Sequence, residues 1–263
     1  MLSIIAATFK GVIRDRVFHG IIVTALLFLF IPAAASLSMR QVTELSITLA
    51  LSLISFILLL LAVFLGGASL WRDMEKRYTY SVLGLPFTRS SYVLGRYAGT
   101  ALFLFCATLL LSATTLVVTW YCSGIYPSER PVAWNYLLLA MFFDFLKYLL
   151  LIAIAFLFST VSTSFFLPIF GTISIFLAGS ASQQVYDFIN SPSGQKLPVQ
   201  TRAAARALYY ILPNFTSFDL KLNAVYGIAV NIPGLLLTSG YFVVYTAVVL
   251  CLATMIFSAR EMK

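Results

Sequence analysis

Long apolar runs dominate the chain and are separated by shorter polar segments. A run of about 20 apolar residues is long enough to cross the hydrocarbon core of a membrane as a helix. Strict alternation of apolar and polar residues is missing, and lipid does not tolerate unpaired strand edges, so helices are expected rather than a barrel. The pattern predicts an all-α polytopic membrane protein with six transmembrane helices, at residues 17–38, 45–70, 98–122, 134–158, 164–182 and 234–258.

Composition and length fit one membrane domain. Of the 263 residues, 61% are hydrophobic and only 10% are charged, which is far more apolar than an ordinary soluble domain. The chain has no internal repeat, low-complexity tract or soluble module. Residues 1–263 are therefore expected to form a single transmembrane domain.

The basic residues indicate the orientation of the spans. Three groups of cations are expected on one side: Lys10, Arg14 and Arg16 in the leader, Arg72, Lys76, Arg77, Arg89 and Arg96 between the second and third spans, and Arg260 and Lys263 at the C-terminus. Short cytoplasmic loops retain Lys and Arg, so both termini are predicted to be cytoplasmic. The net charge of +8 is spread over loop ends rather than gathered with aromatic residues on one soluble face, which argues against nucleic-acid binding.

Residues 1–16 are predicted to form an amphipathic helix that lies along the membrane surface and contacts lipid. Its apolar stripe at helical spacing consists of Leu2, Ile5, Phe9, Val12 and Ile13. Two interpretations stay open: a simple membrane anchor, or an interfacial helix that also touches a partner protein.

The segment 71–97, WRDMEKRYTYSVLGLPFTRSSYVLGRY, holds many of the cations of a sparsely charged chain. Residues 71–83 have the pattern of an amphipathic helix, which the glycine and proline of the GLP sequence end. A second helix is predicted to begin near Thr88 or Ser90, either of which can cap it. A charged helix between two spans indicates a cytoplasmic docking element.

Residues 183–233 form the long loop expected on the outer side, and this loop is too long for a bare turn. Within it, TRAAARALYYIL predicts a short helix that ends at Pro213. The next stretch, FTSFDLKLNAVY, mixes apolar residues with Asp219 and Lys221, which is typical of an interfacial or re-entrant segment. We expect this segment to cover the outer mouth of the bundle.

Two charged residues interrupt the fourth span. Asp144 and Lys147 are three positions apart, which places them on one helical face within reach of each other. Counted from the aromatic residues that open the span, Asp144 lies roughly 15 Å deep, near the middle of the bilayer. The pair is either a substrate or gating site or a mutually neutralising structural pair, and the sequence favours neither.

Small residues indicate close helix packing at two places, and a homodimer contact through the fifth span is the alternative at the second. These residues are Gly95 and Gly99 at the start of the third span, and Gly171, Ser174, Ala178 and Gly179 in the fifth.

Some classes of chemistry lack the residues they need. The single histidine, His19, excludes a His-based metal site or catalytic triad built from this chain alone. No GxxxxGKS or GxxxxGKT phosphate loop is present, so this chain does not supply that type of ATP site. We therefore expect no catalytic, cofactor-binding or metal-binding residue here, and ATP-driven work would need another subunit.

The segment after the second span resembles the ABC-2-type permeases of bacterial ABC transporters, including the copper-processing permeases. Tyr78 stands where that family has a glycine, and Arg96 stands where it has a lysine. The residues that match the family pattern, in order, are Glu75, Thr79, Val82, Leu83, Pro86, Arg89, Gly95 and, as a basic residue, Arg96.

The resemblance implies an ABC-2 exporter-type fold in a bacterial inner membrane, working as a homodimer or pseudodimer. It implies two ATPase subunits, which bind ATP and Mg and dock on the leader and the 71–97 loop; it does not identify copper as the cargo. The residues expected to couple to the ATPase are Met74, Glu75, Arg77, Thr79, Val82, Leu83, Pro86 and Arg89. A secondary transporter or channel that uses Asp144 and Lys147 is the runner-up, and a membrane enzyme ranks last.

Overall fold

The computed structural model describes residues 2–14, 20, 23, 30–36, 41–75, 88–125 and 131–259. Within these ranges the protein consists of helices and the turns that join them, without a strand, so the all-α prediction is confirmed. The helices long and apolar enough to cross a membrane are α4 (Val42–Glu75), α6 (Arg89–Ile125), α7 (Trp134–Val161), α8 (Phe166–Asn190) and α11 (Ile232–Ala259). These five helices make the chain a multi-pass membrane protein.

The described residues leave the predicted count of six spans open. Most of the first predicted span, 17–38, lies outside them. The part of it that is described includes the short helix α3 (Ile31–Ala35), which lies beside α4. The placement of both termini on the cytoplasmic side also stays a prediction.

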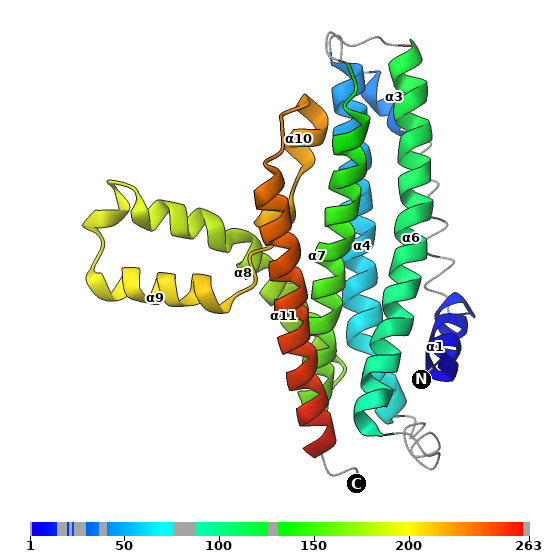
Figure 1. Cartoon of the computed structure of the whole chain (residues 1–263), viewed down its shortest axis with the longest axis vertical. Coiled ribbons are helices and arrows are strands. Elements are labelled where there is room, and N and C mark those ends of the chain that lie inside the picture. The colour runs from blue at the N-terminus through cyan, green and yellow to red at the C-terminus, as the bar shows by residue number, and fades with distance from the viewer. Residues whose placement is uncertain are drawn as a thin grey trace.

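Helix α7 is the centre of the bundle (Figure 1) and contacts α4, α6, α8 and α11. The residues from Leu150 to Phe156 are all buried. Helix α4 approaches α7 closely at Gly66, where a Cβ atom would lie 2.7 Å from the Cβ of Ala155. Next to this contact, Ser159 Oγ donates a hydrogen bond to the Gly67 carbonyl oxygen at 2.8 Å. This packing joins α4 and α7 tightly near one end of the bundle.

Helices α4 and α6 are longer than a membrane crossing requires. Their 34 and 37 residues correspond to about 51 and 55 Å, against a hydrocarbon core of about 30 Å. Both extend to the end of the bundle where α4 finishes at Glu75, called here the Glu75 end. Thr88 caps α6 as the sequence predicts, because its Oγ1 accepts a hydrogen bond from the Ser91 N–H at 3.2 Å.

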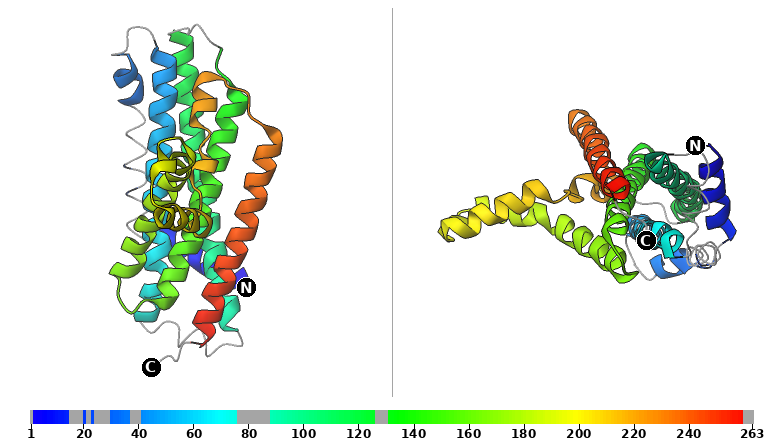
Figure 2. Two further views of the ribbon diagram at one scale, coloured as in Figure 1. Left: turned by 90° about the vertical axis from the view of Figure 1, so that its left-hand side faces the viewer. Right: turned by 90° about the horizontal axis from the view of Figure 1, so that it is seen from below.

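Helix α1 (Leu2–Arg14) lies against the first part of α6 at the Glu75 end (Figure 2). Its buried face consists of Ile4, Thr8 and Val12. The predicted stripe is thus correct at Val12, whereas Ile5 and Phe9 are only half-buried and the side chains of Leu2 and Ile13 lie outside the described residues. The face is shifted because α6 presents glycines to it.

The glycines concerned are Gly95 and Gly99. A Cβ atom at Gly99 would lie 2.6 Å from the Thr8 Cβ, and one at Gly95 would lie 3.0 Å from the Ile4 Cγ2. The close packing predicted at this GxxxG sequence is confirmed, with α1 as the partner.

Helix α8 leaves the bundle sideways. It extends beyond the predicted end of the fifth span to Asn190, and α9 (Val199–Ile211) runs back beside it (Figures 1 and 2). The 3-10 turn η2 (Gly194–Lys196) joins the two helices. The rings of Tyr186 and Tyr209 stack between them with centroids 4.2 Å apart. Helix α9 ends before Pro213, as the sequence predicts.

The small residues of α8 have different surroundings. Gly171 packs on the Phe158 ring, and a Cβ atom at Gly179 would lie 2.3 Å from the Pro213 carbonyl oxygen. Ser174 and Ala178 are exposed. The two glycines therefore serve packing within the chain.

The segment after α9 returns to the bundle. It contains the 3-10 turn η3 (Thr216–Phe218) and the helix α10 (Lys221–Tyr226), which packs on α7 and α4. Phe215 and Phe218 are buried within it. Gly227 ends α10 in the left-handed conformation, with a φ of 65°, which a glycine adopts without strain. The segment thereby places polar side chains between α4 and α7.

Candidate functional site within the bundle

Asp144 and Lys147 form a buried ion pair on α7. Both residues are 6% exposed, and Lys147 Nζ donates a hydrogen bond to Asp144 Oδ1. The structure thus brings together the two residues that their spacing on one helical face predicts. Burial of two charges costs on the order of several kcal/mol in desolvation. Their mutual attraction offsets this cost only when further hydrogen bonds support the pair.

Helix α4 supplies part of that support. Lys147 Nζ donates to Ser55 Oγ at 3.4 Å, and Ser55 Oγ is hydrogen-bonded to Tyr148 Oη at 2.6 Å. The same ammonium lies 4.8 Å from the centre of the Tyr148 ring, within the range of a cation–π contact. The ion pair of α7 is therefore tied directly to α4.

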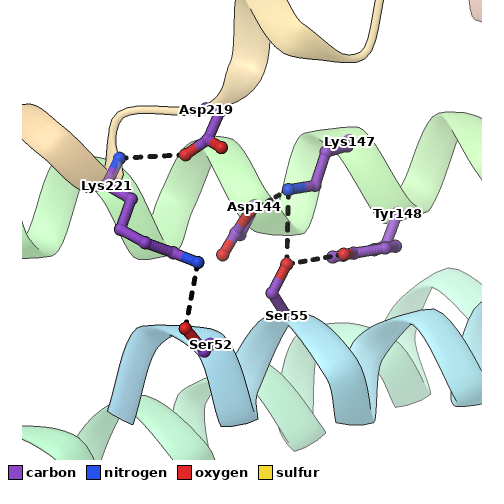
Figure 3. A network of polar contacts seen from close by, with 7 residues as sticks. All are labelled: Ser52, Ser55, Asp144, Lys147, Tyr148, Asp219 and Lys221. Atoms are coloured by element: carbon purple, nitrogen blue, oxygen red, sulfur yellow. Dashed lines mark hydrogen bonds and ion pairs between the residues drawn. The ribbon is translucent and has the colours of Figure 1, made fainter. Parts of the chain in front are cut away.

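A second lysine, Lys221, reaches this region from the first position of α10. Lys221 Nζ donates to Ser52 Oγ at 3.1 Å, and the Lys221 N–H donates to Asp219 Oδ1 at 3.0 Å. Ser52 donates its own hydroxyl proton to the Thr48 carbonyl oxygen at 2.6 Å, which leaves its oxygen lone pairs to accept from Lys221. Figure 3 shows the Lys221 ammonium and the Asp144 carboxylate pointing into the same space between α4 and α7.

We call this set of residues the polar network. Its charges balance, with two carboxylates and two ammonium groups. Lys147 Nζ is in direct contact with Asp144, whereas Lys221 Nζ is hydrogen-bonded to Ser52 and its charge acts on Asp144 from a greater distance. Charged residues within membrane-spanning helices are rare, and they often mark pathways for ions or substrates. The polar network consists of Ser52, Ser55, Asp144, Lys147, Tyr148, Asp219 and Lys221.

The network consists of amine, carboxylate and hydroxyl groups, which can bind charged groups. Within the part of the chain that the structure describes, no group of three His, Cys, Asp or Glu side chains comes together as metal ligands would. Ammonium groups can receive an anion, and carboxylates can receive a cation or a proton.

Three of the residues expected to couple to an ATPase are described, and they lie at the Glu75 end, remote from the network: Met74, Glu75 and Arg89. Met74 and Glu75 form the last turn of α4. Arg77, Thr79, Val82, Leu83 and Pro86 lie outside the described residues, so their role stays a prediction. Arg89 opens α6, and its Nη1 donates to the Ser258 carbonyl oxygen near the end of α11 at 3.1 Å.

Further contacts join α1, α6 and α11 at this end. Arg96 Nη1 donates to Thr8 Oγ1 of α1 at 3.3 Å. The ring of Tyr92 stacks on that of Phe257 of α11, with centroids 6.1 Å apart. These contacts, with that of Arg89, hold the starts of α1 and α6 and the end of α11 in one body beside the last turn of α4.

Sequence reasoning found the ion pair but missed its partners. Ser52 and Ser55 repeat on α4 at the same three-residue spacing as the charged pair, which is the signal that could have drawn attention to them. For Asp219 and Lys221 the sequence predicts a re-entrant or interfacial segment but no partner. Comparison with protein-family models and with curated protein sequences finds no match for this chain.

Proposed function

We propose that the chain is the permease subunit of an ATP-driven ABC transporter of the ABC-2 type, most simply an exporter in a bacterial cytoplasmic membrane. In this proposal the Glu75 end and both termini are cytoplasmic. The subunit works as a homodimer or pseudodimer, and separate ATPase subunits bind ATP and Mg and dock on α1 and on residues 71–97.

One observation carries the proposal: α4 is a continuous helix that contributes residues to the polar network in its first half and leads into the predicted docking loop at its end. Ser52 and Ser55 hold the two lysines of the network, and Met74 and Glu75 begin the docking loop. A partner that moves the Glu75 end of α4 would therefore also move the part of this helix that contacts the buried charges. The contacts among α1, α6 and α11 fix these three helices relative to one another where such a partner would bind.

The test is to purify the tagged chain from its native membrane in a mild detergent and to identify the proteins that accompany it by mass spectrometry. We expect an ATPase with a GxxxxGKS or GxxxxGKT loop in stoichiometric amount. Its absence, under conditions that keep other membrane complexes intact, would contradict the proposal.

A secondary transporter or channel is the second candidate, and the buried pair of Asp144 and Lys147 favours it. Such a protein would transport after reconstitution alone, driven by an ion gradient and indifferent to ATP. A permease subunit would need both ATP and its ATPase.

A further inference from the structure

The short helix α10 lies beside the buried ion pair and packs on both α7 and α4 (Figure 1). Its inner side chains, Ala224 and Val225, are buried against the bundle, and Ala224 is only 1% exposed. Its outer side chains include Leu222, which is 65% exposed, and Tyr226. Helix α10 therefore has one face toward the polar network and one face away from the bundle.

The chain on the two sides of α10 is held differently. Before α10, the buried rings of Phe215 and Phe218 pack on those of Phe176 and Tyr241, so this segment is fixed to α8 and α11. After α10, residues 227–231 have no regular structure and are largely exposed. Segments with few buried contacts open at the lowest cost in free energy. Helix α10 is thus attached to a fixed segment at its start and to an exposed link at its end.

Charged groups join α10 to the bundle (Figure 3). Lys221 Nζ donates a hydrogen bond to Ser52 Oγ at 3.1 Å, and its charge attracts the Asp144 carboxylate. The charge of Asp219 attracts Lys147 but also repels Asp144, so its two effects oppose each other. Lys221 is therefore the charged residue of this segment that favours the packed position of α10.

We propose that α10 is a lid beside the buried ion pair and that Lys221 is the latch that holds this lid closed. Opening turns α10 about the fixed segment that contains Phe215 and Phe218, separates Lys221 from Ser52 and gives Asp144 and Lys147 access to the space outside the bundle. The lid is a property of this chain alone. Its use in transport rests on the proposed permease function, in which a movement of α4 relative to α7 draws Ser52 away from Lys221.

The experiment measures how fast N-ethylmaleimide labels a cysteine on the inner face of α10, in the purified full-length chain with its native cysteines replaced by alanine. Ala224→Cys should react slowly, because the label reaches this buried position only while the lid is open. Adding Lys221→Gln should raise the rate about tenfold, since the loss of a charged hydrogen bond increases the open fraction by about this factor. Leu222→Cys, on the outer face, should react fast with either residue at position 221.

Three variants test the latch itself. Lys221→Arg keeps the charge and should keep the slow rate. Asp219→Asn removes one attraction and one repulsion and retains an oxygen that can accept the Lys221 N–H, so it should change the rate little. Ser52→Ala should raise the rate, and its combination with Lys221→Gln should add little, because both residues belong to one contact. Lys196→Gln, in the exposed turn between α8 and α9, is the matched control and should behave as wild type.

A cysteine elsewhere distinguishes lid opening from loosening of the whole bundle. Ala253 is fully buried on α11, outside the lid, so Ala253→Cys should stay slow to react when Lys221→Gln is present. Equal acceleration at positions 224 and 253, or an unchanged rate at position 224, would overturn the proposal. A latched lid in a chain without an accompanying ATPase would support the lid and contradict the permease function, whereas an accompanying ATPase with an unchanged rate at position 224 would contradict the lid alone.

Discussion

Lys147 and Asp144 form an ion pair one turn apart on α7, and the same ammonium also reaches Ser55 of α4. The pair is therefore both a local feature of one helix and a link between the two helices at the centre of the bundle. Any change in its charge alters the contact between α4 and α7.

Removal of one member of the pair should be far more harmful than removal of both. Asp144→Asn leaves the Lys147 charge buried without its partner, and we expect a loss of about 3–5 kcal/mol in the free energy of unfolding. The double variant Asp144→Asn/Lys147→Gln should recover part of that loss. Thermal unfolding and monodisperse yield in one detergent measure the effect, and Asp187→Asn, on an exposed part of α8, is the control.

The same variants separate the two roles of the pair. Poor folding of the single variant with recovery in the double variant assigns a structural role. Normal folding with lost transport assigns the pair to the substrate pathway. Normal folding together with normal transport in Asp144→Asn and in Lys147→Gln would contradict both the structural role and the role in the substrate pathway.

The contact between α1 and α6 depends on the absence of a side chain at Gly99. Gly99→Val places atoms where Thr8 now lies, so we expect α1 to separate from α6 at a cost of about 1–3 kcal/mol. Hydrogen exchange over residues 4–12 should become faster. Gly11→Ala is the control, since a Cβ atom at Gly11 meets nothing within 4 Å. Unchanged exchange in Gly99→Val would show that α1 is not held by this contact.

The five spans that the structure describes were predictable because a run long enough to cross a membrane is a local property of the sequence. The pairing of Asp144 with Lys147 and the cap at Thr88 were predictable for the same reason, since each involves residues within one helical turn. The course of α8 was not: its apolar residues predict a span, but tilt depends on neighbouring helices. Phe166, Phe170 and Leu177 are exposed on α8.

The rest of the site depends on contacts between distant parts of the chain. Lys221 and Ser52 are 169 residues apart, and no spacing rule relates them. The buried face of α1 was predicted from its most apolar stripe, whereas packing selects Ile4 and Thr8 because they fit against Gly95 and Gly99. In both cases the tertiary arrangement decides which polar or small residues matter.

The topology predicted from the distribution of cations can be tested by cysteine labelling. In a background without native cysteines, we expect single cysteines at positions 78 and 262 to react only from the cytoplasmic side and one at position 195 only from outside. A membrane-impermeant maleimide applied to intact cells and to inverted vesicles distinguishes the two sides. Labelling of position 78 from outside would reverse the proposed orientation.

The predicted docking loop should tolerate few changes on its contact face. Leu83→Asp places an unpaired carboxylate in a contact from which water is excluded, whereas Glu75→Arg reverses a charge expected at its rim. We expect both variants to keep the wild-type topology and folded yield. Both should bind the ATPase less tightly than the wild type, and Leu83→Asp should bind it least tightly. Quantitative copurification of the ATPase with each variant measures this, and equal recovery with the wild type would leave the loop as a charged topological anchor.

The proposal that ATP hydrolysis by a partner drives this subunit can be tested by measuring the ATPase activity of that partner in lipid vesicles, alone, with the wild-type chain and with Leu83→Asp. We predict that the wild-type chain changes the hydrolysis rate and that Leu83→Asp removes most of this change, about tenfold in the coupled rate. A rate that is the same in all three preparations would contradict the account.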